Sequence, residues 1–80
     1  MQEASDEYRG YRIVVTPIKD CEDMWDFEYR LKRLDGSGEE RIRSKSAGGS
    51  ATPETACFAG IEVARTEIDN LLALENARQG

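Results

Sequence analysis

The chain has 80 residues, which is enough for a single small domain with a thin hydrophobic core. Hydrophobic residues make up 39% and charged residues 34%, a balance typical of a globular rather than a disordered protein, and the net charge of −5 disfavours long-range attraction to nucleic acid or anionic lipid. There is no histidine, so the commonest general base and metal ligand is missing, and no segment approaches the roughly 20 apolar residues that a membrane-spanning helix needs.

The ends of the chain and its cysteines predict a cytoplasmic, reduced protein. Residues 1–7 lack the basic start and apolar core of a signal peptide. Cys21 and Cys57 are too few for a disulfide scaffold and too far apart in the sequence to form a metal-binding pair. We expect disordered tails at residues 1–8 and 76–80 around one domain at residues 9–75.

The first predicted strand covers residues 11–16, which are rich in β-branched residues. Alternation places Tyr11, Ile13 and Val15 on one face. Pro17 has no N–H to donate to a neighbouring strand. We therefore expect this strand to end at Pro17 or to lie at a sheet edge.

The second predicted strand, at residues 25–32, has the clearest pattern in the chain. Apolar and charged residues alternate through four cycles, so a period of two puts Trp25, Phe27, Tyr29 and Leu31 on one face. An aromatic face could stack nucleic-acid bases, but the interpretation as core is favoured because an amphipathic helix follows to cover it.

A turn and a polar third strand follow. Asp35-Gly36 favours a hairpin turn, because glycine adopts positive φ without steric cost. Residues 40–46 form the third strand, in which Ile42 is the sole large apolar residue; this composition suits a sheet edge. Residues 47–51 are expected to form a flexible turn, and a helix-capping connector is favoured there over an anion-binding loop.

A long helix is predicted from residue 53 to about residue 75. Thr52 is the expected N-cap, Pro53 the first helical residue and Glu54 the acid of the first turn. Gly60 is disfavoured inside a helix, but a missing side chain lets the helix lie close to the sheet. The apolar face of this helix contains Cys57, Ile61, Ala64, Ile68, Leu71 and Leu72, and is widened by Phe58, Gly60 and Val63.

These elements predict an α+β fold, in which a three-stranded antiparallel β-meander packs against one long C-terminal α-helix, in the order β-β-β-α. The acidic cluster of Asp20, Glu22, Asp23 and Asp26 has neither the spacing nor the glycine of a calcium loop. We see no nucleophile–base pair, and a domain this small has little room for a deep pocket. We therefore expect no catalytic, cofactor-binding or metal-binding residues, no small-molecule ligand, and a protein that is not an enzyme.

Two surfaces are candidates for binding a protein partner or a second copy of the chain. The last helical turns are expected to extend past the sheet and to expose leucines, and an edge strand can accept another strand. The candidate partner-binding residues are Leu71, Leu72, Leu74, Arg41, Arg43 and Lys45.

Nucleic-acid binding through a basic patch on the second and third strands is the alternative. Nearby acids favour a solvated, neutralised face instead. The alternative nucleic-acid contacts are Arg30, Lys32, Arg41, Arg43 and Lys45.

Three segments carry a resemblance: Tyr8-Arg9-Gly10, residues 25–30 and residues 49–56. Across most of residues 8–75 the chain resembles small uncharacterised bacterial proteins of unknown function, which implies a bacterial, cytoplasmic domain and no activity. Its layout is also similar to that of plant AP2-type DNA-binding domains, but residues 13–16 lack the arginines and tryptophan that read bases there. The sequence as a whole predicts a non-catalytic protein-interaction module or an accessory subunit of a larger assembly.

Overall fold

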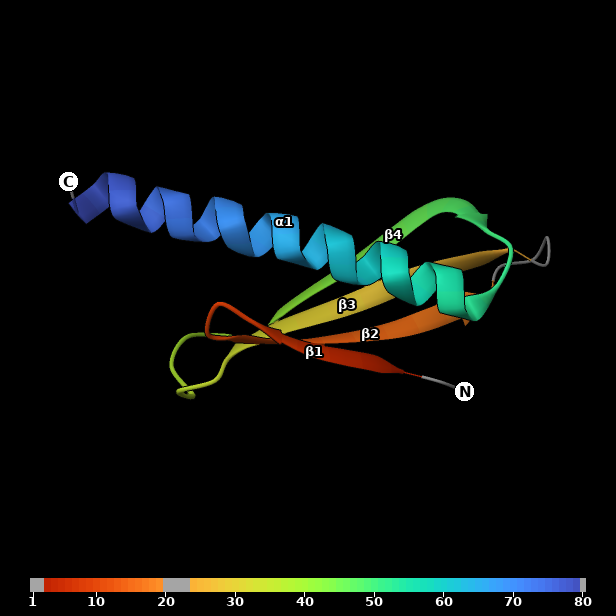
Figure 1. Cartoon of the computed structure of the whole chain (residues 1–80), viewed down its shortest axis with the longest axis horizontal. Helices are drawn as coiled ribbons and strands as arrows, with labels where there is room; N and C mark the ends of the chain where they lie inside the picture. Colours follow the sequence, from red (N-terminus) through yellow and green to blue (C-terminus); the bar gives the residue numbers. More distant parts are fainter. Residues whose placement is uncertain (1–2, 20–23, 80) are drawn as a thin grey trace.

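The computed structural model of the chain describes residues 3–19 and 24–79, apart from the side chains of residues 45–49 and 78–79. Within these residues, four strands come first and a single long helix follows (Figure 1). The elements are β1 (Ala4–Tyr8), β2 (Tyr11–Lys19), β3 (Trp25–Arg33), β4 (Arg41–Ser50) and α1 (Pro53–Gln79).

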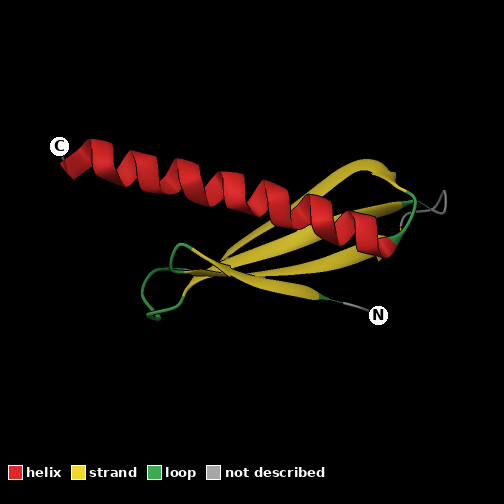
Figure 2. Cartoon of the chain, in the orientation of Figure 1, coloured by secondary structure: helices red, strands yellow, loops and turns green. Residues whose placement is uncertain are grey.

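The four strands form one antiparallel sheet in the order β1-β2-β3-β4, and α1 lies across one face of it (Figure 2). Most helix contacts are with the two central strands, β2 and β3. The predicted α+β class, with a β-meander and a C-terminal helix, is confirmed. The predicted number of strands is wrong, because the sheet has four strands rather than three.

The additional strand is β1, which occupies residues expected to be a disordered tail. A two-residue hairpin connects it to β2, and Tyr8 pairs with Tyr11. Arg9 has a φ of 50° and Gly10 a φ of 87°, the pair of positive values that a tight hairpin turn requires. Arginine seldom occupies the first of these positions, so the sequence did not identify the turn.

β2 also differs from its prediction, because it continues through Pro17 to Lys19 and lies inside the sheet. Pro17 is paired with Phe27 of β3, and it lies beyond Val15, the last β2 residue paired with the described part of β1. A proline is compatible with this position because no described residue of β1 pairs with it on the other side of β2. Its ring adds to the buried core.

The core lies between the sheet and α1, as the alternation predicted. Ile13, Val15, Leu31 and Ile68 are fully buried, and Tyr11, Phe27 and Tyr29 are nearly so. Two apolar surfaces therefore close on each other, and each large side chain that they bury contributes about 1.5–3 kcal/mol.

Gly60 marks the closest approach between helix and sheet. A Cβ at this position would lie 2.5 Å from Val15 Cγ1 and 3.1 Å from Phe27 Cδ1. The expectation that its missing side chain allows close packing is confirmed. Phe58, in contrast, does not widen the buried face, because its side chain is 74% exposed.

The β3–β4 connection contains the predicted turn. Gly36 has a φ of 81°, and the Asp35 carboxylate accepts hydrogen bonds from the N–H and the hydroxyl of Ser37. β4 is an edge strand as predicted, but it continues through residues 47–50, which were expected to be a turn. Phe27 pairs with Lys45 and Trp25 with Ser50, so the ladder contains an irregularity between these pairs.

The helix begins as predicted and ends later. The Thr52 hydroxyl accepts a hydrogen bond of 3.1 Å from the Thr55 N–H, which makes Thr52 the N-cap. The helix has 27 residues and is about 40 Å long, whereas a nine-residue strand spans about 30 Å. It therefore includes residues 76–79 of the expected tail, and its C-terminal turns extend past the sheet (Figure 1).

Candidate functional site

The cations of the predicted basic patch lie on two different faces. Arg43 is paired with Tyr29, whose side chain faces the helix, so Arg43 lies on the helix side. Arg30 is paired with Ile42, which puts both on the opposite face. Lys32 is exposed on that same outer face and Arg41 on the helix side, while the Lys45 side chain lies outside the described residues.

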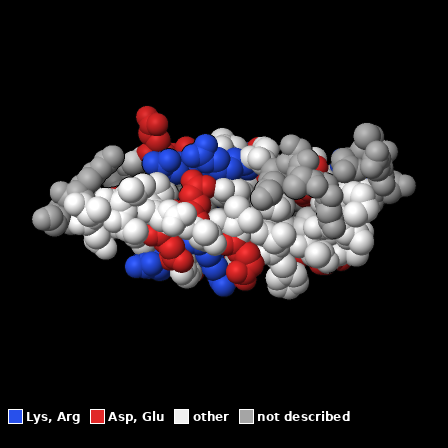
Figure 3. Space-filling model, turned by 90° about the horizontal axis from the view of Figure 1, so that it is seen from above, with Lys and Arg blue, Asp and Glu red and all other residues white. Residues whose placement is uncertain are grey.

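Acidic groups neighbour the described cations on both faces. Arg43 Nε lies 3.5 Å from a carboxylate oxygen of Glu67, and a guanidinium nitrogen of Arg30 lies 4.0 Å from Glu28. Figure 3, which shows the face that carries α1, has Asp and Glu side chains beside each group of Lys and Arg. Among the described residues no continuous basic surface forms, so the geometry does not favour nucleic-acid binding.

The predicted leucine surface at the helix end is smaller than expected. Leu72 packs against the core, and Leu71 is half-buried. Leu71 and Arg41 line one shallow hollow of about 380 Å³ together with Arg33 and Glu75, which form an ion pair. Leu74 is the leucine of this set that is mostly exposed, at 60%.

A row of hydrogen bonds and ion pairs connects β1 and the turn after it to α1. Arg65 donates a hydrogen bond of 2.6 Å to Asp6, and its guanidinium lies over the Tyr8 ring. Asp69 accepts hydrogen bonds from the Tyr8 hydroxyl at 3.0 Å and from Arg9 at 2.7 Å. The bond from Arg65 lowers the pKa of Asp6, and the bonds from Arg9 and then Tyr8 lower the pKa of Asp69.

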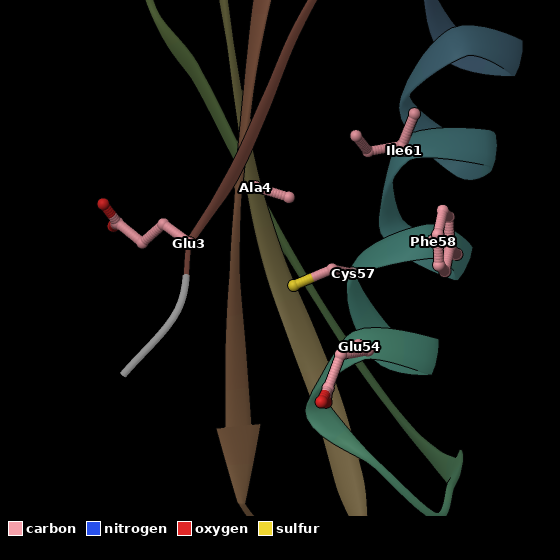
Figure 4. A pocket seen from close by; sticks show the side chains of 6 residues that line it. All are labelled: Glu3, Ala4, Glu54, Cys57, Phe58 and Ile61. Atoms are coloured by element: carbon pink, nitrogen blue, oxygen red, sulfur yellow. The ribbon is translucent and has the colours of Figure 1, made fainter.

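Asp6 is the residue of this row nearest to the N-terminus of β1. Beyond it, the space between β1 and α1 is an apolar groove. Ala4 is the next β1 residue that faces the helix, and its small side chain leaves a hollow of about 210 Å³ opposite the first turns of α1. Figure 4 shows the Ala4 side chain directed towards the helix and those of Cys57 and Ile61 directed towards the sheet. We call this the β1–α1 groove; its lining residues are Glu3, Ala4, Glu54, Cys57, Phe58 and Ile61.

The helix residues of the β1–α1 groove follow a spacing of three and four, so they form one stripe along α1. Phe58 belongs to this stripe. Among all described residues it is the most exposed large apolar side chain. Phe58 was expected to widen the buried face of the helix and Ala4 to lie in the tail, so the groove was not predicted. The helical spacing was visible in the sequence, but the second wall depends on β1.

Two groups with possible chemical roles have pKa values that argue against reactivity. Burial raises the pKa of the Cys57 thiol, and a hydrogen bond from the Ala4 backbone only partly opposes this effect. Burial, followed by a 2.5 Å hydrogen bond to Glu67, raises the pKa of Tyr29 to about 12. A protonated thiol is a poor nucleophile, so the groove supports binding better than covalent chemistry.

The described residues contain no group of three or more side chains arranged to hold a metal ion. Of the predicted acidic cluster, Asp26 lies in β3, whereas Asp20, Glu22 and Asp23 lie outside the described residues, as does Cys21. Within the part of the chain that the structure describes, no helix is both long and apolar enough to cross a membrane.

In the described residues, the fold and the surface define a small α+β domain with an apolar groove beside the edge strand β1. No protein-family model, curated protein or solved structure matches the chain. The candidate site therefore depends on the geometry of the chain itself.

Proposed function

We propose that the chain is a non-catalytic protein-interaction domain, or the accessory subunit of a larger assembly, and that it binds its partner through the β1–α1 groove. The observation that carries this proposal is the exposure of Phe58, 74% of whose surface is open to solvent at the rim of an apolar hollow. Covering a phenylalanine side chain contributes about 1.5–3 kcal/mol, which makes this position a strong anchor for a partner.

The chemistry of the groove supports binding rather than catalysis. Its walls are mostly apolar, and the one thiol among the lining residues, that of Cys57, has a raised pKa. A buried cysteine thiol also suits the reducing cytoplasm, where we place this function.

Comparative co-purification tests the proposal. The full chain and two variants, Phe58→Ser and Leu34→Ser, are expressed with an affinity tag in the source cells, and bound proteins are quantified by mass spectrometry. Leu34 is the matched control, because it is also an exposed apolar residue, at 47%, but lies in the β3–β4 turn. Circular dichroism verifies that all three proteins fold.

We expect at least one protein to be retained by the wild type and by Leu34→Ser and to be lost with Phe58→Ser. Identical sets of bound proteins in all three samples would contradict the proposal. Equal loss in both variants would also contradict it, since the effect would then not depend on the groove.

A further inference from the structure

We propose that the occupant of the β1–α1 groove is an extended segment of a partner protein that pairs with β1 as a fifth strand, inserts one apolar side chain into the groove and carries lysine or arginine beside it. This inference rests on the proposed function and adds the binding mode and the chemistry of the partner.

The backbone of β1 offers the hydrogen-bonding groups that strand addition needs. β1 is the first strand of the sheet order, so one of its sides is an open edge. A two-residue hairpin makes Tyr8 and Tyr11 a hydrogen-bonded pair, and the alternation of an antiparallel ladder then turns the N–H and C=O of Ser5 outward. A partner residue opposite Ser5 would exchange two hydrogen bonds with these groups.

The next outward-facing N–H of β1, that of Glu7, is not available to a partner strand. The N–H of Glu7, which the alternation also turns outward, donates to the Asp6 carboxylate at 2.9 Å. A second strand therefore finds a free donor at Ser5 and an occupied one at Glu7. Pairing is restricted to the end of β1 that borders the groove.

The alternation of side chains determines what the partner must insert. Ala4 faces the helix, so the partner residue opposite Ala4 directs its side chain to the same face and into the groove. The hollow of about 210 Å³ is smaller than the roughly 300–1,000 Å³ of typical small-molecule sites. It suits a single aliphatic or aromatic side chain, held between Ala4, Cys57 and Phe58.

The charges around the groove favour a basic partner. Glu54 lines the groove from the first turn of α1, and Figure 4 shows Glu3 directed to the other side of β1. The partner residue opposite Ser5 lies on that side, near Glu3, so lysine or arginine there is favoured. Pairing between the β1 strands of two copies is disfavoured instead, because it would set acidic residues opposite each other.

The test uses phage-displayed libraries of nine-residue peptides, selected against the full wild-type chain. One library is unbiased, and a second is biased towards amphipathic helices. We expect the unbiased library to yield peptides with one large apolar residue next to lysine or arginine. Replacement of the residue opposite Ser5 by its N-methyl analogue should reduce affinity at least tenfold, because it removes a ladder hydrogen bond.

Three variants locate the bound peptide. Phe58→Ser removes the exposed wall, Ala4→Leu fills the hollow, and Glu54→Gln removes a carboxylate; each should weaken binding several-fold or more, whereas Leu34→Ser should not. NMR hydrogen exchange gives an independent readout, because a fifth strand should slow exchange of the Ser5 amide at least tenfold. The exchange readout does not depend on the stability of any variant, since it is measured on the wild type.

The outcomes separate this inference from the proposed function. Helical peptides that bind in a Phe58-dependent way, without protection of Ser5, would overturn strand addition and leave the interaction function standing. Acidic or uncharged binders would overturn the charge argument. The solution mass of the wild type could increase with protein concentration, and Ala4→Leu could abolish this increase. That result would show that a second copy of the chain occupies the groove, and it would overturn the choice of partner. If neither peptides nor co-purifying proteins depend on Phe58, both proposals fail.

Discussion

Replacing Gly60 by alanine tests whether the helix and the sheet approach each other as closely as the structure shows. The added Cβ would lie 2.5 Å from Val15 Cγ1, and 3.1 Å and 3.2 Å from two ring carbons of Phe27. An ordinary contact between carbon atoms is about 3.5–4.0 Å, so helix and sheet would have to separate by roughly 1 Å or more.

Two effects of opposite sign determine how much Gly60→Ala changes the free energy of unfolding. Alanine is favoured over glycine inside a helix by about 1 kcal/mol, whereas overpacking a core costs about 1–3 kcal/mol. Val15 is fully buried, β-branched and paired on both sides, so it has little freedom to rotate or move away. The overpacking cost should therefore lie in the upper part of its range, about 2–3 kcal/mol, which leaves a net loss of about 1–2 kcal/mol and a decrease of roughly 5–15 °C in Tm.

Thermal and denaturant unfolding followed by circular dichroism measure the effect. Ala73→Gly, at an exposed position of α1, is the matched control and should cost up to about 1 kcal/mol through helix propensity alone. In a Val15→Ala background the cost of Gly60→Ala should decrease by at least about 0.5 kcal/mol, because the closest contact is removed. A Gly60→Ala protein more stable than the wild type would refute the close approach.

Three further predictions concern the cap and two titrating groups. Thr52→Ala should lower the free energy of unfolding by about 1 kcal/mol in denaturant titrations, because the Thr55 N–H loses its acceptor; an unchanged midpoint would refute the cap. Arg65 lowers the pKa of Asp6, so the pair stabilises the fold above about pH 4 and this contribution is lost as the pH falls through the lowered pKa. Thermal melts of Asp6→Asn between about pH 2 and pH 7 should therefore show a shallower loss of stability in acid than the wild type, and parallel curves would contradict this. The pKa of Tyr29 is raised to about 12 from 10.0, so its contribution is complete below pH 10 and is lost as the pH rises towards 12; Tyr29→Phe should lose less stability than the wild type above pH 10, and an equal loss would count against the buried phenol.

Several parts of the fold were accessible from local sequence because they depend on neighbouring residues. The alternation of residues 25–32 predicted which face of β3 is buried, and Thr52 and Pro53 predicted the start of α1. The close approach at Gly60 could also be anticipated, since the glycine lies within an apolar helical stripe.

The candidate site was less accessible because its parts are remote in the sequence. The helix positions of the β1–α1 groove have a visible spacing, but whether Phe58 is covered depends on what packs beside it. The basic patch considered as an alternative is divided for a related reason: the pairing register, rather than the composition of the strands, sends Arg30 and Arg43 to opposite faces.

The two surfaces that form the core could be predicted from local sequence, because a period of two and a period of 3.6 both follow from the local backbone geometry. The strand at residues 4–8, in contrast, depends on contacts with distant parts of the chain. That segment has no apolar alternation of its own, and it is held by its pairing with β2 and by the bond from Arg65 to Asp6, 59 positions apart in the sequence. The bond from Arg65 to Asp6 forms only when the helix packs on the sheet, and the β1–α1 groove likewise needs both elements in place.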